Sequence, residues 1–313
     1  MSSTATTPIA AEPCATTVRR SAILTALALG AVWVIWGSTY LAIRFGLETM
    51  PPYLMQGCRF AVASVVLFLI VGRRRASMPT GRQLRNAALV GVLLLIGGVG
   101  MVTLAEDQGV DSGLIATLIA VQPMLMSLWG GLWGTWPRRA EWIGMTIGLV
   151  GVAVLMADNG LEGTSAGIGL VFFACLNWSL GSTLSRRLDM PPGAMATVVE
   201  MAAAAVVFMV LSRVTSEDLV MPSARSGLAL AYLTVFGSVI AFSAFTYLIA
   251  NVRASLAMSY AYVNPVIAVT LGALLAGERL SPNLVLALPI ILLGVAIVTN
   301  APRLGTKRNA SSS

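Results

Sequence analysis

The sequence predicts an all-α membrane protein with ten transmembrane helices, arranged as two inverted five-helix repeats with both termini in the cytoplasm. Composition, the distribution of charge between apolar segments and an internal duplication support this prediction. Of the 313 residues, 57% are hydrophobic and 11% are charged, whereas soluble domains carry roughly 25% charged residues. This composition excludes an ordinary soluble enzyme, a disordered chain and a disulfide scaffold. The net charge of +7 is distributed between apolar runs, so we expect the lipid bilayer, and no nucleic acid, as a partner.

Ten segments are long and apolar enough to cross the hydrocarbon core, which takes about 20 residues of helix. They are residues 22–45, 52–71, 84–105, 113–134, 142–157, 166–185, 193–211, 227–250, 255–276 and 284–299. Short loops connect them, so no soluble domain fits between spans. The predicted domains are an N-terminal cytoplasmic tail (1–21), two repeats (22–160 and 161–300) and a C-terminal cytoplasmic tail (301–313).

The loop charges orient these spans in the inner (plasma) membrane as a multi-pass protein. Fifteen lysines and arginines fall on the side that contains both termini, and three fall on the opposite side. Cytoplasmic loops carry the excess of basic residues. A missed span would scramble this bias, so the count of ten and the cytoplasmic termini are predicted together.

The two halves of the chain resemble each other. Gly37-Ser38-Thr39 recurs as Gly181-Ser182-Thr183, and Gln122-Pro123 recurs as Asn264-Pro265. Because each unit holds an odd number of spans, the second unit must insert upside down relative to the first. Inverted repeats are typical of secondary transporters, in which the two halves rock about a site near the midplane. Two such halves form a complete pathway, so we expect a monomer.

Three motifs carry a resemblance to a known family. They are Trp36-Gly37-Ser38-Thr39-Tyr40, Arg59-Phe60 and Gly277-Glu278-Arg279. Together they resemble the drug/metabolite transporter superfamily, and within it the ten-span group with two EamA-type repeats. The first repeat departs from the third motif, because its corner reads Trp136-Pro137-Arg138. The resemblance implies export of amino acids, other small metabolites or toxic organic compounds. The inverted repeats predict that this transport works by alternating access.

Aromatic and amide side chains near mid-span are the candidate lining of a substrate cavity. Trp36 and Tyr40 share one helix face, since they are spaced by about one turn. A buried amide in lipid must either tie helices together or face a cavity, and both alternatives stay open. The candidate cavity residues are Trp36, Tyr40, Gln122, Asn177, Trp178, Tyr260 and Asn264. Pro123 and Pro265 are predicted to bend their helices, because proline lacks the backbone donor.

Two charges lie inside predicted spans, where each costs roughly 2.5–3.5 kcal/mol near the midplane. Arg59 and Glu200 are therefore candidates for a coupling role or for a structural one. Glu200 is the leading candidate for binding a proton, and the alternative is a snorkelling or arginine-paired residue. We expect either facilitated transport or coupling through the substrate itself.

The sequence carries no catalytic constellation, because histidine is absent and no phosphate-binding loop occurs. Cys14, Cys58 and Cys175 have no metal-ligand spacing, so neither a metal site nor a cofactor nor enzymatic activity is expected. The tryptophans and amides favour an amphipathic small-molecule substrate. The best expectation is export of neutral and aromatic amino acids. The alternatives are efflux of toxic or cationic organic compounds, or a carrier for a different small metabolite.

Overall fold

The computed structural model describes residues 15–72, 78–110, 112–157, 164–276 and 283–300, and every regular element within these ranges is helical. Among them, six stretches are long and apolar enough to cross a membrane. These are Ala22–Leu47, Pro52–Val71, Gly81–Asp107, Ser165–Ser185, Ala194–Val214 and Ala224–Asn251. The prediction of an all-helical membrane protein is confirmed. The Gly277-Glu278-Arg279 motif, Cys14 and most of both tails lie outside the described residues.

The first half begins with two long helices, followed by more interrupted ones. The elements are α1 (Ala15–Leu47), α2 (Pro52–Gly72), α3 (Gly81–Gly91), the π-helix η1 (Val92–Gly100), α4 (Met101–Asp107), α5 (Ser112–Ile119), α6 (Gln122–Leu132) and α7 (Arg139–Met156). α3, η1 and α4 run on without a gap. The predicted segment 113–134 is divided between α5 and α6, which begins at Gln122 with Pro123 in its first turn.

The second half repeats this order. Its elements are α8 (Ser165–Ser185), α9 (Ala194–Val214), α10 (Ala224–Tyr232), the π-helix η2 (Leu233–Phe242), α11 (Ser243–Asn251), α12 (Ala254–Ala257), α13 (Tyr260–Ala276) and α14 (Leu284–Asn300). The predicted segment 255–276 is again interrupted, here between α12 and α13. Pro265 lies inside α13, beyond that interruption. The remaining four predicted segments do not each form one long helix. Segments 113–134 and 255–276 are interrupted, and segments 142–157 and 284–299 form the shorter helices α7 and α14.

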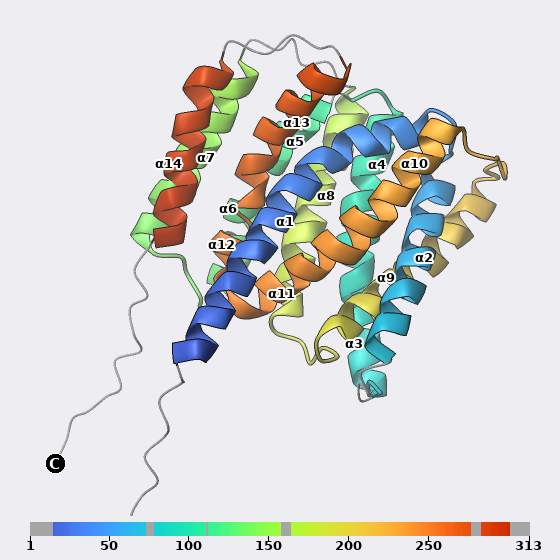
Figure 1. Ribbon diagram of the computed structural model, residues 1–313, viewed down its shortest axis with the longest axis horizontal. Coiled ribbons are helices and arrows are strands. Elements are labelled where there is room, and N and C mark those ends of the chain that lie inside the picture. Colours follow the sequence, from blue (N-terminus) through green and yellow to red (C-terminus); the bar gives the residue numbers. More distant parts are fainter. Residues whose placement is uncertain (1–14, 73–77, 111, 158–163, 277–282, 301–313) are drawn as a thin grey trace, which may run out of the picture.

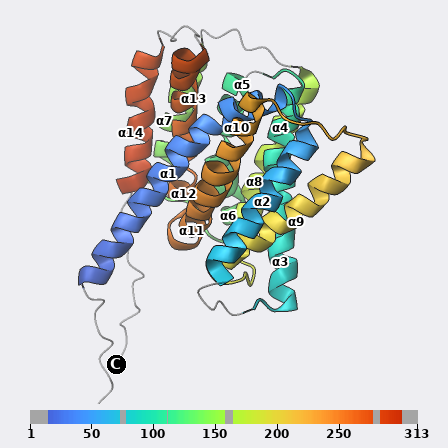
Figure 2. The same ribbon diagram turned by 45° about the vertical axis from the view of Figure 1, so that its right-hand side comes forward.

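The two halves are interlaced rather than side by side (Figures 1 and 2). α1 packs against α13 and against the α10–η2–α11 stretch of the second half. Its counterpart α8 packs against α6 and against the α3–η1–α4 stretch of the first half. Each half thus completes its packing with the other, and the middle of the bundle is built from both.

Two helix pairs flank this middle, α2 with α9 and α7 with α14. In the second pair, glycines bring the backbones into contact. A Cβ atom added to Gly294 would lie 2.6 Å from the backbone nitrogen of Gly148. Only hydrogen fits at that distance, so the α7–α14 contact requires glycine.

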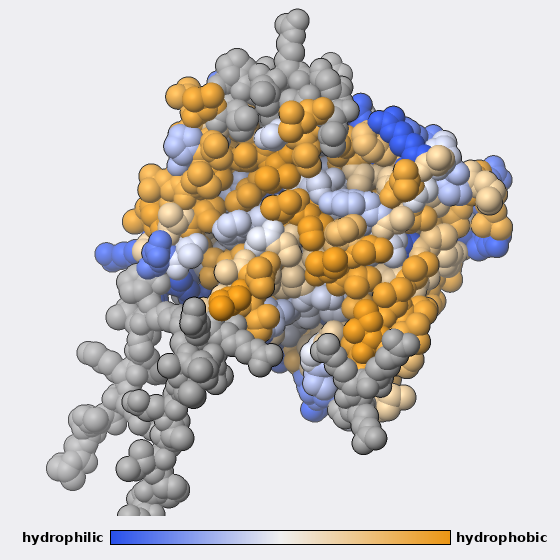
Figure 3. Space-filling view, in the orientation of Figure 1, coloured by the Kyte–Doolittle hydropathy of each residue, from blue (hydrophilic) through white to orange (hydrophobic). Residues whose placement is uncertain are grey.

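The face of the bundle shown in Figure 3 is largely apolar, with polar residues gathered toward the ends of the bundle. Phe68 on α2, Phe173 on α8 and Leu286 on α14 are among the exposed hydrophobic side chains of the bundle. An apolar surface of this extent suits contact with lipid chains rather than water.

At one end of the bundle, polar contacts join the two halves. Asp189, between α8 and α9, accepts hydrogen bonds from Gln83 and Arg82 at the start of α3. These bonds hold the pKa of the Asp189 carboxyl below its ordinary range.

Candidate functional site

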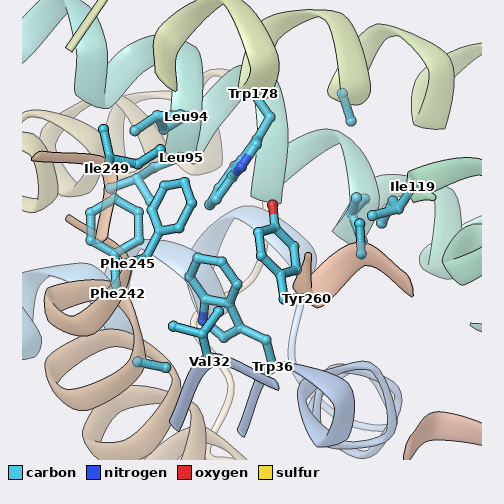
Figure 4. Close-up of a cluster of buried hydrophobic side chains, with 14 of the residues drawn as sticks. Val32, Trp36, Leu94, Leu95, Ile119, Trp178, Phe242, Phe245, Ile249 and Tyr260 are labelled. Atoms are coloured by element: carbon cyan, nitrogen blue, oxygen red, sulfur yellow. The ribbon is translucent and has the colours of Figure 1, made fainter. Parts of the chain in front are cut away.

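Aromatic rings from four helical segments meet in the middle of the bundle (Figure 4). The ring centroid of Trp36 on α1 lies 5.3 Å from that of Trp178 on α8 and 4.9 Å from that of Tyr260 on α13. Phe245 on α11 lies 5.0 Å from Trp36 and 5.2 Å from Trp178. Edge-to-face and tilted pairs at these separations are favourable, so the rings form a defined wall.

This wall bounds a narrow central cavity of about 80 Å³. Both halves of the chain contribute to it. Its lining comprises Trp36, Thr39, Tyr40, Ile43, Arg59, Phe60, Leu95, Gly98, Val99, Val102, Ile119, Gln122, Ala174, Trp178, Gly237, Ser238, Phe242, Tyr260 and Asn264. A mainly apolar lining with a few convergent polar groups is usual for a small-molecule site, but such pockets measure about 300–1,000 Å³, so this cavity must widen before it holds a molecule of amino-acid size.

Arg59 is the one charged residue in the described lining of this cavity. Its side chain is buried, and its Nε–H donates to the Ser238 hydroxyl at 2.8 Å while Nη1 donates to the Gln56 amide oxygen at 3.3 Å. Both partners are neutral, and no carboxylate in the described part of the chain forms an ion pair with it. A buried charge needs a counter-charge to offset its lost hydration, so Arg59 creates a demand for an anion.

Polar groups of the aromatic wall line the same cavity as this cation. The Tyr260 hydroxyl donates to Gln122 Oε1 at 2.8 Å, and the Trp36 indole donates to the Gly237 carbonyl at 3.2 Å. The Trp178 indole N–H faces the Tyr260 hydroxyl but makes no hydrogen bond of good geometry within the described part of the chain. The cavity therefore offers a cation and an unused donor, both suited to an acceptor-rich ligand.

Of the seven candidate cavity residues from the sequence, the structure brings six together. Asn177 is not among the residues that line the cavity. Its amide donates to the Phe173 carbonyl of its own helix at 2.9 Å. Asn264 lines the cavity, and with its amide oriented to satisfy its neighbours it donates to the carbonyls of Trp33 and Tyr260. Glu200 lies in a different cavity, described below.

Sequence reasoning missed the contribution of the two π-helices. η1 supplies Leu95, Gly98 and Val99, and η2 supplies Gly237, Ser238 and Phe242. A Cβ atom on Gly98 would lie 2.7 Å from a ring carbon of Trp178, so this glycine lets the indole approach. Glycines at matching places of the two repeats are the signal that could have identified these segments, and π-helical turns often occur at functional sites.

A bundle of apolar helices around a buried, partly polar cavity defines a membrane protein that handles small molecules. The comparison with known proteins names the family. Residues 21–157 and again 165–300 match the EamA-like transporter family, so the chain belongs to that family. It is a multi-pass inner-membrane transporter of small molecules, and the resemblance seen in the sequence is confirmed.

Two curated relatives and one solved structure extend this result. The chain is 45% identical over 273 residues to the uncharacterized inner membrane transporter YedA of Escherichia coli K12, covering 87% of this chain and 89% of YedA. It is 23% identical to a probable amino-acid metabolite efflux pump of the same strain, covering 85% of this chain and 91% of the pump. A crystal structure of a protein 22% identical to this chain has a TM-score of 0.73, over 89% of this chain and 97% of the other. That likeness shows a shared fold.

Proposed function

We propose that this transporter exports small metabolites that carry a carboxylate, with neutral and aromatic amino acids as the best candidates. The observation that carries the proposal is Arg59, a buried cation with only neutral partners on the wall of the central cavity. A substrate carboxylate would supply the missing counter-charge through charge-assisted hydrogen bonds. The Trp178 indole N–H is a second donor available to it.

The aromatic wall suits the rest of such a molecule. Faces and edges of Trp36, Trp178 and Tyr260 give an apolar surface for an aromatic or aliphatic side chain. An ammonium group can rest against the same rings, because their faces attract cations. The relative described as a probable amino-acid metabolite efflux pump supports this substrate class.

Efflux of purely cationic compounds is the rival function, and the cavity favours it less. No carboxylate occurs among the described lining residues, whereas Arg59 would repel a cation. Glu200, the acid inside a predicted span, lies outside that lining.

We also propose that the chain crosses the membrane ten times as two inverted repeats and works by alternating access. The described start of α1 and the described end of α14 point toward the same end of the bundle (Figures 1 and 2), which an even number of crossings requires. The equivalent packing of α1 and α8 supports related halves. The cavity lies within the bundle of a single chain, and we propose that the transporter works as a monomer.

Reporter fusions test this topology. Green fluorescent protein joined after Ser313 should fluoresce, and alkaline phosphatase at the same place should be inactive, because the C-terminus is cytoplasmic. Alkaline phosphatase inserted after Leu219, between α9 and α10, should be active. The reverse pattern at either place would exclude ten crossings with cytoplasmic termini.

Transport itself is tested with purified protein in proteoliposomes loaded with unlabelled amino acids. Labelled phenylalanine, leucine and threonine should enter by saturable counterflow. Uptake that rises linearly with concentration would indicate a channel, and counterflow of a cationic dye without any amino acid would support the rival function. A covalently changed product, detected by mass spectrometry, would contradict simple transport.

A further inference from the structure

Glu200 lies in a second cavity, separate from the central one. This cavity has a volume of about 380 Å³, and its lining shares no residue with that of the central cavity. It runs between α9 and α11, where Thr197, Ser243 and Thr246 line it together with Glu200, and reaches the loop before α9. That loop belongs to the end of the bundle that we propose to face the cytoplasm.

Neither structural explanation offered by the sequence fits Glu200. Its side chain is 1% exposed, so it does not snorkel to the surface. No arginine in the described ranges pairs with it, and its Oε2 atom is buried without a hydrogen-bond partner. The Ser243 hydroxyl, on the wall of the same cavity, also lacks a partner among the described residues. A buried acid in this setting needs a ligand.

The charged residues on the helices around Glu200 do not supply a positive partner for its carboxylate. α9 packs against α2, α3, η1 and α11, and η1 and α11 carry no charged residue. On α3, Arg82 is paired with Asp189 at the surface. Arg59 of α2 belongs to the central cavity, and Tyr247 of α11 is the other titratable group that lines the Glu200 cavity. The other arginines of these elements are Arg85 on α3 and Arg213 at the far end of α9.

We propose that Glu200 is a proton-binding site that couples export to the proton gradient, with the second cavity as its route to the cytoplasm. A metal ion would need about six oxygen ligands, several of them charged, and Glu200 is the one carboxylate in the described lining of this cavity. Thr197 donates to Thr246 at 3.1 Å, and Thr246 donates to the Phe242 carbonyl at 3.0 Å. A proton needs only one carboxylate oxygen. The protonated side chain is then a neutral carboxylic acid inside the cavity.

Phe245 links this site to the central cavity. It lines the Glu200 cavity and also packs against Trp36 and Trp178, at ring separations of 5.0 and 5.2 Å. Opposite it, α9 is held tightly against α3, because a Cβ atom on Gly91 would lie 2.5 Å from the Glu200 carbonyl oxygen. Phe245 is therefore the side chain through which a change in the charge of Glu200 would reach the wall of the substrate cavity. The coupling role rests on the proposed export function.

The test uses Glu200→Gln, which keeps the shape and removes the titrating group, with Asp218→Asn on the exposed α9–α10 loop as the control. In proteoliposomes, wild-type transport should be several-fold faster with a pH gradient than without one. Glu200→Gln should lose that stimulation while keeping saturable counterflow, and Asp218→Asn should behave as wild type. Equal stimulation of Glu200→Gln and wild type, or no stimulation of wild type, would overturn the proposal.

A second measurement needs no substrate, so it separates this inference from the proposed function. Infrared difference spectra of the purified protein, recorded during a pH titration, should contain a carboxylic-acid carbonyl band that disappears in Glu200→Gln and shifts in Glu200→Asp. A spectrum identical in wild type and Glu200→Gln would overturn proton binding by Glu200. Failure of amino-acid counterflow with this band present would overturn only the substrate class.

Discussion

Arg59 of α2 and Ser238 of η2 are joined by a hydrogen bond of 2.8 Å that connects the two repeats at the wall of the central cavity. The residues are 179 positions apart in the chain. Arg59 Nη2 also lies against Gly237, at 3.0 Å from the place where a Cβ atom would stand. The guanidinium is thus held by neutral groups of both halves, in a position to recognise an anion.

Removal of this charge should weaken substrate binding. Charge-assisted hydrogen bonds contribute about 1.5–3 kcal/mol, so Arg59→Gln should raise the Kd for a carboxylate substrate roughly 10- to 100-fold. Arg59→Lys should lose less, since it keeps the charge without the planar geometry. Quenching of tryptophan fluorescence in detergent measures the Kd. Arg213→Gln, at the exposed end of α9, is the control, and an equal loss in both variants would contradict a local role.

Removal of the Trp178 indole N–H should weaken substrate binding less than removal of the Arg59 charge. Trp178→Phe keeps a ring in the wall but removes the N–H donor, so the Kd should rise about fivefold, the equivalent of a hydrogen bond of about 1 kcal/mol. Trp129→Phe is the matched control, because its indole donates to Ser179 and does not line the cavity. Counterflow titrations compare the two. A larger loss in Trp129→Phe would place the important indole elsewhere.

A substitution at Gly98 tests whether transport requires the close approach of η1 to the aromatic wall. Gly98→Ala would place a methyl group 2.7 Å from a Trp178 ring carbon, so the indole must move. We expect transport to fall several-fold while the protein still folds and inserts. Gly30→Ala on α1, which meets no neighbouring atom within 4 Å, should transport at the wild-type rate. Normal transport by Gly98→Ala would show that the observed ring position is not needed.

The α7–α14 contact predicts a loss of stability rather than of function. Gly294→Ala forces a methyl group against the backbone of Gly148, and overpacking of this kind costs about 1–3 kcal/mol. The Tm in detergent should fall by several degrees, measured by tryptophan fluorescence during heating. Gly169→Ala on α8, which has open space around it, should keep the wild-type Tm. An unchanged Tm for Gly294→Ala would contradict the close packing.

The helical membrane fold was predictable because lipid demands long apolar helices, and such runs are visible directly in the sequence. The positions at which the helices are interrupted were less predictable. The segment 113–134 carries Pro123, and the helix restarts at Gln122 as expected near a proline. In the second repeat the interruption precedes Tyr260 rather than lying at Pro265, and no local signal specifies that one-turn difference.

Only part of the candidate site was predictable from the sequence. Trp36, Trp178 and Tyr260 stood out because bulky aromatics at mid-span are unusual. Phe242 and Phe245 look like ordinary lipid-facing residues, and only tertiary packing directs them inward. Asn177 shows the opposite case. Its amide is satisfied within α8, an option that helix geometry gives to every buried amide and that the sequence leaves undecided.

The most direct test of the account is whether the substrate carboxylate is recognised through Arg59. Saturable counterflow of a labelled neutral amino acid would be measured in proteoliposomes while its unlabelled acid, its amide and its decarboxylated amine compete. For the wild type, we predict that the acid competes at least tenfold better than the amide or the amine, and that Arg59→Gln loses this preference. Equal or better competition by the amine in the wild type would contradict the carboxylate site and favour cation efflux.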